Sequence, residues 1–257
     1  MPSRPMESRF TRAIVRSPAP TLGKGLTTVD LGQPDYGLAC RQHDAYCATL
    51  ERAGLTVTVL EALPDYPDAH FVEDVAVPVG ATVVLTRPGA APRREEVAAI
   101  RPIFPDAPSI VAPGFLDGGD VLQVGRHFVV GLSARTNAAG AEQFGAVAEQ
   151  LGFSWQAVRV PGGLHLETSV NALSDRKLIA TAEFSQEPWV RALDDDPLLA
   201  LGYEANVVRV NDFVLIPSGF PETSAKLQAL GYALLEVSTS EYEKMDGGLS
   251  CLSLRLP

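Results

Sequence analysis

A thiol, an imidazole and several carboxylates occupy four turn-like segments that are far apart in this 257-residue chain. The segments read "DAHFVED" with Asp74, "FLDGGD" with Asp117, "GGLHLE" with His165 and "MDGGLSC" with Cys251. Covalent catalysis requires a nucleophile, a base and a group that orients the base, and Cys251, His165 and Asp117 are of these three types. The set therefore predicts thiol-based covalent chemistry, provided that the fold brings the segments together.

Each of these residues also has an ordinary structural explanation. A lone Cys is commonly a small buried hydrophobic residue, and Cys251 is expected inside the last apolar strand. His165 alone could be a core histidine, and Asp117 beside Gly118 and Gly119 is typical of a turn. Only their occurrence at corresponding points of a repeated pattern favours catalysis.

The pattern is a strand pair, a helix and a further strand, with a period of about 50 residues. Polar turns break four apolar stretches into predicted hairpins at 75–86, 120–133, 169–182 and 205–218. Predicted helices lie at 41–54, 93–104, 137–152 and 221–231, with a shorter, less regular one in 183–197. Further apolar runs follow at 55–63, 109–113, 155–161 and 233–238. Five such units would fill the chain, and equivalent turns of a ring converge on its axis, so the four segments could form one pocket.

Composition excludes several classes of protein. The formal net charge of −10 argues against a nucleic-acid partner, because phosphate binding requires basic patches. Three cysteines form no disulfide framework in a chain of this length, which indicates a reducing compartment. Neither a signal-type leader nor an apolar run of membrane-spanning length is evident, so we expect a cytoplasmic protein without membrane contact.

A second group of residues, "CRQHDAYC", places Cys40, His43 and Cys47 at helical spacing. Three ligands on one helix fall short of a structural zinc site, and the two thiols are too far apart along a helix to form a disulfide. We interpret them as core residues. The "DGG" and "GGD" segments also lack the spacing of a phosphate-binding loop.

The ordered motifs "FVEDVAV", "LTRPGA" with "PRR", "LDGGDVL", "GLSARTN", "LHLE" and "DGGLSC" resemble the dimethylarginine dimethylaminohydrolase family of guanidino-modifying enzymes. The resemblance covers nearly the whole chain and implies a single catalytic domain over 1–257. It also implies the pentein fold, an α/β propeller of five ββαβ units around a pseudo-fivefold axis. This agrees with the repeat.

The resemblance implies roles for individual residues. Cys251 would be the nucleophile, His165 the general acid and base, and Asp117 the group that orients the imidazole. The implied substrate contacts are Asp74 and Glu73 to the guanidinium, Arg93 and Arg135 to the α-carboxylate, and the carbonyls of Leu26 and Met245 with Asp68 to the remaining polar groups.

The implied reaction converts Nω-methylated arginines to citrulline and an alkylamine through a thiouronium on Cys251. The expected partner is this small-molecule substrate, and no metal or organic cofactor is required. The superfamily includes dimers, so the resemblance is compatible with a homodimer. The cationic guanidinium suits acidic residues, and the carboxylate suits Arg, which binds carboxylates bidentately.

One position departs from the family pattern. Glu167 follows "LHL", where these hydrolases tend to have Lys and arginine deiminases have an Asp that binds an unsubstituted guanidinium. A carboxylate there would favour arginine as substrate, unless Glu167 points away from the site or pairs with an Arg, which we favour. The alternatives are therefore an arginine deiminase-like enzyme, a pentein binding protein without catalysis, and a zinc-regulated or thiol-sensing protein.

Overall fold

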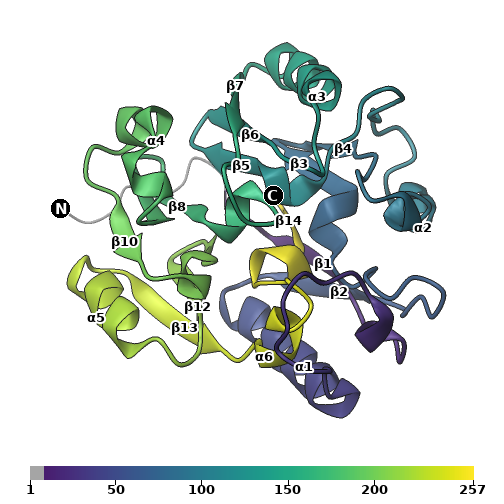
Figure 1. Ribbon diagram of the computed structural model, residues 1–257, viewed down its shortest axis with the longest axis horizontal. Helices are drawn as coiled ribbons and strands as arrows, with labels where there is room; N and C mark the ends of the chain where they lie inside the picture. Colours follow the sequence, from purple (N-terminus) through teal and green to yellow (C-terminus); the bar gives the residue numbers. More distant parts are fainter. Residues whose placement is uncertain (1–8) are drawn as a thin grey trace.

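Five small β-sheets surround a common centre, and each carries its helix on the outside of the ring (Figure 1). The computed structural model describes residues 9–257. The first eight residues of the N-terminal segment, in which we expect no apolar leader, lie outside the described residues. The strand orders are β14-β1-β2, β3-β4, β5-β6-β7, β8-β9-β10 and β11-β12-β13.

The secondary-structure elements have the following bounds. The strands are β1 Arg12–Arg16, β2 Thr56–Leu60, β3 Ala76–Val79, β4 Thr82–Leu85, β5 Val121–Val124, β6 His127–Leu132, β7 Ser154–Arg159, β8 Val170–Ser174, β9 Lys177–Thr181, β10 Leu198–Ala200, β11 Val208–Val210, β12 Phe213–Pro217, β13 Ala233–Val237 and β14 Leu254–Leu256. The α-helices are α1 Tyr36–Arg52, α2 Glu96–Ile100, α3 Ala138–Gln150, α4 Pro188–Leu193, α5 Pro221–Ala229 and α6 Ser240–Glu243.

The four predicted hairpins are confirmed as the antiparallel pairs β3-β4, β5-β6, β8-β9 and β11-β12. Their tight turns explain the local sequence, because Gly80, Gly125 and Asn211 all have positive φ at the corresponding turn. Gly adopts this conformation freely and Asn tolerates it better than most residues. After the helix of a unit, the chain returns as a parallel third strand beside the hairpin, as β7 does next to β6.

The second unit departs from the prediction, because its helix is shorter and its third strand is absent. The predicted helix at 93–104 has only α2 in α-helical form, with 3-10 turns on both sides, and Pro102 lies in the second of them. The apolar run 109–113 forms an isolated bridge from Ser109 to Leu85 instead of a strand, so this sheet has two strands. In the predicted segment 183–197, helix α4 spans six residues.

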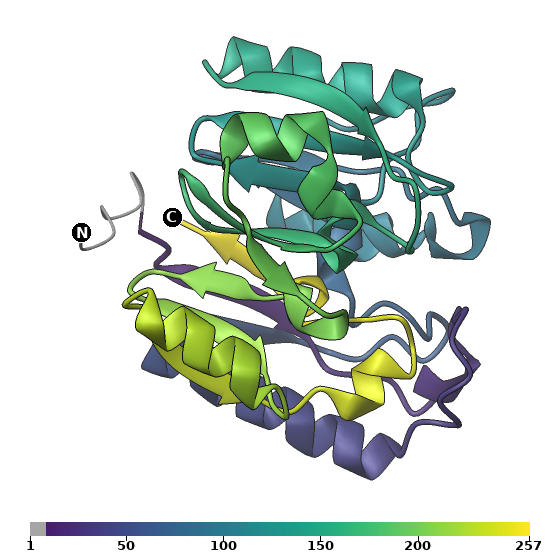
Figure 2. The same ribbon diagram turned by 60° about the vertical axis from the view of Figure 1, so that its left-hand side comes forward.

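The two ends of the chain close the ring. Strand β14 pairs antiparallel with β1, which pairs parallel with β2, so the first unit takes one of its hairpin strands from the C-terminus. Figure 2 shows the yellow β14 beside the purple β1. The sequence repeat did not reveal β1, since its hairpin partner lies at the other end of the chain.

The hydrophobic core consists of five clusters, one at each junction between neighbouring units. At one junction, Val77 of β3 packs in the same cluster as Phe128 of β6 and Phe144 of α3. At the closing junction, Val15 of β1 and Leu50 of α1 join Leu215 of β12. Because each unit buries apolar residues against both neighbours, the ring stabilises itself by closure.

Five short 3-10 turns lie at the axis, one ahead of the first strand of each unit. They are η2 Val72–Val75, η5 Gly118–Asp120, η6 Leu166–Thr168, η8 Tyr203–Ala205 and η9 Ser250–Leu252. The turns pack against one another in the order η9, η2, η5, η6 and η8. The expectation that Cys251 lies inside a strand is wrong, because it belongs to η9 and β14 begins only at Leu254.

None of the helices within residues 9–257 has the length and apolar character that a membrane crossing requires.

Candidate active site

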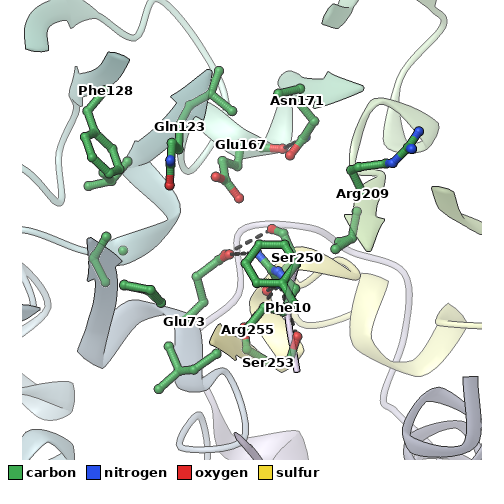
Figure 3. Close-up of a pocket in the computed structure, with 18 of the residues that line it drawn as sticks. Phe10, Glu73, Gln123, Phe128, Glu167, Asn171, Arg209, Ser250, Ser253 and Arg255 are labelled. Carbon is green, nitrogen blue, oxygen red and sulfur yellow. Dashed lines mark hydrogen bonds and ion pairs between the residues drawn. The ribbon is translucent and has the colours of Figure 1, made fainter. Parts of the chain in front are cut away.

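The axial turns form a wall between two cavities, which we call the front and rear cavities. The front cavity, of about 20 Å³, is lined by Leu26, Asp68, Phe71, Asp74, Arg93, Arg135, Leu164, His165, Met245, Asp246, Gly247 and Cys251. The rear cavity, of about 370 Å³, has Glu73, Gly118, Glu167, Ser250 and Arg255 among its lining residues (Figure 3). Adjacent residues of one turn thus serve opposite faces: Asp74 lies in front and Glu73 behind, as do Cys251 and Ser250.

His165 and Asp117 form a buried pair at the front of this wall. The Nε2 atom of His165 lies 3.0 Å from Oδ2 of Asp117. The other oxygen of Asp117, whose side chain is 0% exposed, accepts a hydrogen bond from the Gly89 N–H at 2.8 Å. A Cβ at Gly119 would stand only 2.8 Å from Nδ1 of His165, so the imidazole needs glycine at that position. The hydrogen bond from Asp117 and the close approach of Gly119 together restrict the orientation of the ring.

A second carboxylate approaches the same imidazole from the opposite side. Oδ1 of Asp74 lies 3.9 Å from Nδ1 of His165 and accepts a hydrogen bond from the Gly119 N–H at 3.3 Å. Its Oδ2 pairs with the guanidinium of Arg93. Asp74 thus lies between two cationic groups and keeps one edge toward the front cavity.

These charges control the protonation of His165. Burial alone would lower the pKa of His165, but the carboxylates of Asp74, Asp117 and Asp120 outweigh it and raise the pKa to about 9. Burial would raise the pKa of Asp74, but His165 and Arg93 outweigh it and lower that pKa. At neutral pH the His165 imidazolium therefore faces the Asp74 carboxylate, and His165 can donate a proton.

Cys251 shares the front cavity with His165 and is a free thiol. Its Sγ accepts a hydrogen bond from the Gly248 N–H at 3.4 Å. Burial, together with the negative charges of Glu73 and Asp74, raises the pKa of the Cys251 thiol well above its ordinary value. A cation entering the cavity would reverse that effect and favour the thiolate, which is the nucleophilic form.

The predicted residues for the amino-acid end of a substrate, Leu26, Asp68, Arg135 and Met245, all line the front cavity. The Leu26 N–H donates to Oδ2 of Asp68 at 3.0 Å, and Met245 lines the same cavity. The Arg135 side chain is 17% exposed, and its Nη1 lies 3.7 Å from Oδ2 of Asp117. Of the two predicted carboxylate-binding arginines, Arg135 is therefore the more accessible.

Arg93 lines the front cavity, but its N–H groups are already occupied. It pairs with Asp74, and it bonds the carboxylate of Glu96 at 2.8 Å and the carbonyls of Asp68 and Phe71 at 3.1 Å. The side chain is 5% exposed. In this arrangement Arg93 supports Asp74 and does not present a free fork to a carboxylate.

Two acidic residues, Glu73 and Glu167, line the rear cavity, and only the position of Glu73 differs from the expectation. Glu73, predicted to face the guanidinium beside Asp74, lines the rear cavity, where it accepts a hydrogen bond from Ser250 Oγ at 2.9 Å and lies 3.4 Å from Arg255. Glu167 also lines the rear cavity, which agrees with the interpretation that it points away from the site. Residues 73 and 74 point to opposite faces because η2 turns by about 120° per residue.

Sequence reasoning missed several residues that position the site. Glu96 neutralises Arg93 at i+3 spacing, and this spacing on a helix was the available signal. Asp120 accepts hydrogen bonds from Ser133 Oγ at 2.6 Å and from the Leu166 N–H at 3.0 Å, which anchors the chain next to His165. The second Asp of "LDGGD" thus holds the chain next to His165, whereas the first bonds the imidazole itself.

Two groups of side chains contain residue types that bind metal ions. Asp74, Asp117 and His165 offer ligand atoms within 4.8 Å of one another, yet Arg93 pairs with the first and Arg135 stands near the second, so guanidinium groups already compensate these acids. In the other group, His43 is buried and Cys47 packs against the core, as predicted, while Cys40 is partly exposed. Neither arrangement requires a metal.

A ring of five ββαβ units with a thiol, an acid-flanked imidazole and paired carboxylates at its axis defines a pentein hydrolase of the guanidino-modifying type. No family model matches the sequence. N(G),N(G)-dimethylarginine dimethylaminohydrolase of Pseudomonas aeruginosa is 41% identical over 255 residues, which are 96% of this chain and 99% of that protein. The Streptomyces coelicolor protein of the same name is 37% identical over 95% of this chain and 96% of its own. This chain belongs to the dimethylarginine dimethylaminohydrolase family.

Solved structures of related proteins have the same fold as this chain. A cysteine-to-serine variant of the P. aeruginosa enzyme in complex with citrulline superposes with a TM-score of 0.92 at 40% identity, over 97% of this chain and 100% of that one. The N-terminal domain of ArgZ, a cyanobacterial arginine dihydrolase, has a TM-score of 0.84 at 19% identity, over 97% and 98% of the two chains. The second likeness concerns the fold, and together they confirm the predicted pentein.

Proposed function

We propose that this protein hydrolyses Nω-methylated arginines to citrulline and an alkylamine, with Cys251 as nucleophile. The observation that carries the proposal is the front cavity, where Cys251, the His165–Asp117 pair and Asp74 come together from four different units. The P. aeruginosa relative that binds citrulline is similar over the whole chain.

The substrate is a cation at one end and an amino acid at the other. Asp74, which is ionised and lines the front cavity, binds the guanidinium. Arg135 binds the α-carboxylate, while Asp68 and the carbonyls of Leu26 and Met245 surround the α-amino group. Charge complementarity at both ends fixes the register of the guanidinium carbon above the sulfur.

The first chemical step forms the Cys251–carbon bond. The bound guanidinium lowers the pKa of the Cys251 thiol, whose proton leaves to solvent, and the thiolate attacks the guanidinium carbon. In the tetrahedral adduct, His165 donates its proton to the methylated nitrogen, and the carbon–nitrogen bond breaks. Dimethylamine or methylamine departs, and an S-alkyl thiouronium remains on Cys251.

The second step returns the enzyme to its starting state. Neutral His165, held by Asp117, removes a proton from water, and the resulting hydroxide attacks the thiouronium carbon. The carbon–sulfur bond breaks, the proton of the new hydroxyl group passes to the departing sulfur, and citrulline carries the carbonyl oxygen while Cys251 returns to the thiol. Every atom comes from substrate or water.

The position of Glu167 favours methylated substrates over arginine. An arginine deiminase would use a front-facing carboxylate at this point to bind an unsubstituted nitrogen, whereas Glu167 lines the rear cavity. We also expect this activity in the cytoplasm, as a step of arginine metabolism.

The test is a citrulline assay on the purified protein with dimethylarginine, monomethylarginine and arginine side by side, with the released amine identified by mass spectrometry. Citrulline with dimethylamine from the first substrate, and little product from arginine, is the expected result. Preferred turnover of arginine with release of ammonia would make the protein a deiminase and contradict the proposal.

A further inference from the structure

Of the five axial turns within residues 9–257, only η8 supplies no group to the proposed reaction. Each of the other four turns carries or directly follows one of the proposed reactive residues, Asp74, Asp117, His165 and Cys251. The residue that follows η8 is Asn206, which is 4% exposed. A buried amide needs partners for its carbonyl and its N–H groups, so the contacts of Asn206 indicate what this turn does.

Asn206 joins two turns that hold reactive groups. Its Oδ1 accepts a hydrogen bond from the N–H of Ser250 at 3.0 Å, and Ser250 immediately precedes Cys251. Its Nδ2 donates to the carbonyl of Glu167 at 3.1 Å, two residues after His165. The same Nδ2 lies 3.1 Å from Ser250 Oγ. One side chain thus connects the main chain of the nucleophile's turn to that of the general acid's turn.

Asn206 also packs against the loop that contacts the sulfur atom. A Cβ at Gly248 would stand 2.4 Å from both Cγ and Oδ1 of Asn206, so the amide lies directly on the glycine backbone. The N–H of Gly248 donates a hydrogen bond to Cys251 Sγ at 3.4 Å. A single residue therefore separates Asn206 from the reacting atom.

The turn that carries Cys251 depends on such outside support. The turn η9 is three residues long, and the main-chain bond that closes it measures 3.4 Å, against roughly 2.7–3.2 Å for an ordinary N–H···O bond. Ser250 Oγ donates to Glu73 at 2.9 Å, and the Ser250 carbonyl accepts from Arg255 at 3.2 Å (Figure 3). Asn206 supplies the third partner, for the Ser250 N–H. Since a displacement of about 1 Å can lower a rate by roughly 100-fold, these bonds bear on catalysis.

We propose that Asn206 is a positioning residue, which keeps Cys251 and His165 in register for attack and proton transfer. This inference rests on the proposed function, because it concerns the turn of the proposed nucleophile. The groups proposed to bind the substrate, such as Asp74 and Arg135, line the front cavity, and Asn206 is not among its lining residues. Loss of Asn206 should therefore change kcat and leave KM nearly constant.

A second buried amide provides the matched control. Asn171 is also 4% exposed, and it donates to the same carbonyl of Glu167 at 2.6 Å and to that of Ala205 at 2.9 Å. These bonds join η6 to η8 and do not involve η9. Replacement of either asparagine by leucine, which has a similar branched shape, leaves the other amide on Glu167. The two variants therefore differ in the support of the turn that carries Cys251.

The first experiment compares the kinetics of three variants with those of the wild type, well below each Tm. Asn206→Leu should lower kcat for dimethylarginine by about 10–100-fold and keep KM within about threefold. Asn206→Asp keeps the shape and the acceptor for the Ser250 N–H, so its kcat should lie between these two values. It also carries the test where the leucine variant does not fold. Asn171→Leu should lower Tm to a similar extent but keep kcat within about threefold.

The second experiment needs no substrate, and so it separates this inference from the proposed function. Alkylation by iodoacetamide, followed by peptide mapping, gives the reaction rate of the Cys251 thiol. Burial raises the pKa of this thiol, and the hydrogen bond from Gly248 opposes the rise. Displacement of Gly248 in Asn206→Leu should therefore slow alkylation at about pH 8 by roughly threefold or more. Asn171→Leu should react at the wild-type rate.

Three results would overturn the inference. A wild-type kcat in Asn206→Leu would mean that Asn206 serves stability alone, and an alkylation rate at or above that of the wild type would mean the same. An equal loss of kcat in Asn171→Leu would show that the effect does not depend on η9. If the wild type itself forms no citrulline, the proposed function fails, and the alkylation rates still decide whether Asn206 supports the turn of Cys251.

Discussion

Both faces of the axial wall carry carboxylates from the axial turns, but the nearby cations shift the pKa values of these carboxylates in opposite directions. On the front face, Asp74 lies between Arg93 and His165, and its pKa is lowered despite burial. On the rear face, Glu73 and Glu167 share one nearby guanidinium, that of Arg255, and burial raises the pKa of both. The pKa values of neighbouring carboxyl groups in one turn therefore shift in opposite directions, because the two faces differ in the number of nearby cations.

This difference supports the proposal that catalysis takes place in the smaller, front cavity. In the proposed mechanism, ionised Asp74 attracts the guanidinium and helps to keep His165 protonated. The bound guanidinium then lowers the pKa of the Cys251 thiol, which burial and nearby carboxylates otherwise raise. The rear face has carboxylates but neither a thiol nor an imidazole among its lining residues.

Replacement of the front-face nucleophile should have the largest effect. Cys251→Ser should lower citrulline formation by about 10⁴-fold or more, since the thiolate is lost, while circular dichroism and Tm stay close to wild type. Cys40→Ser, a partly exposed thiol far from the wall, is the control and should keep full activity. Retained activity in Cys251→Ser would show that another group attacks the substrate.

Replacement of Asp117, the carboxylate that bonds His165, should have the second largest effect on activity. Asp117→Asn keeps the shape of the buried pair but weakens its hold on the imidazolium, and we expect kcat to fall by about 10²–10⁴-fold. The measurement is kcat against pH, together with Tm. A variant with normal kcat would mean that Asp117 serves stability alone.

The raised pKa of His165 predicts a pH dependence of stability. A group whose pKa is higher in the folded state, about 9 against an ordinary 6.5, contributes stability that is complete below pH 6.5 and is lost as pH rises through 9. The loss amounts to about 3 kcal/mol at most. Urea unfolding from pH 6 to 10 should show this decline in the wild type and a flatter profile in His165→Asn. Parallel profiles would contradict the imidazolium at neutral pH.

Truncation of Arg135 in the front cavity should be milder. Arg135→Ala should raise KM by about 10–100-fold with a smaller change in kcat, because a charged hydrogen-bonding partner of the carboxylate is removed. Arg176→Ala, an exposed arginine on a hairpin turn, should leave both constants unchanged. An unaltered KM in Arg135→Ala would show that another group binds the α-carboxylate of the substrate.

The smallest effect is expected on the rear face. Glu167→Gln should leave the ratio of kcat/KM for dimethylarginine and arginine within about twofold, since the side chain does not reach the front cavity. A large shift of this ratio would mean that Glu167 contacts the substrate after all.

Repetition in the sequence predicted a ring or an array of similar units, and the family resemblance identified the ring. The hairpin and helix periods exposed four units directly, and the chemical residues stood at matching junctions. The sequence did not predict which face each residue serves: Glu73 and Asp74 are adjacent acids, and only the packing of η2 against η5 and η9 separates them. The role of Arg93 was hidden for the same reason, because Asp74 and Glu96 occupy it only in the folded ring.

The most direct test of the central claim, that the front face performs covalent chemistry, is mass spectrometry of the intact protein after acid quench during turnover of dimethylarginine, followed by peptide mapping. We predict a thiouronium adduct on Cys251 in the wild type and in Glu167→Gln, and none in Cys251→Ser. Citrulline formation without any adduct, or an adduct on a different residue, would contradict the account.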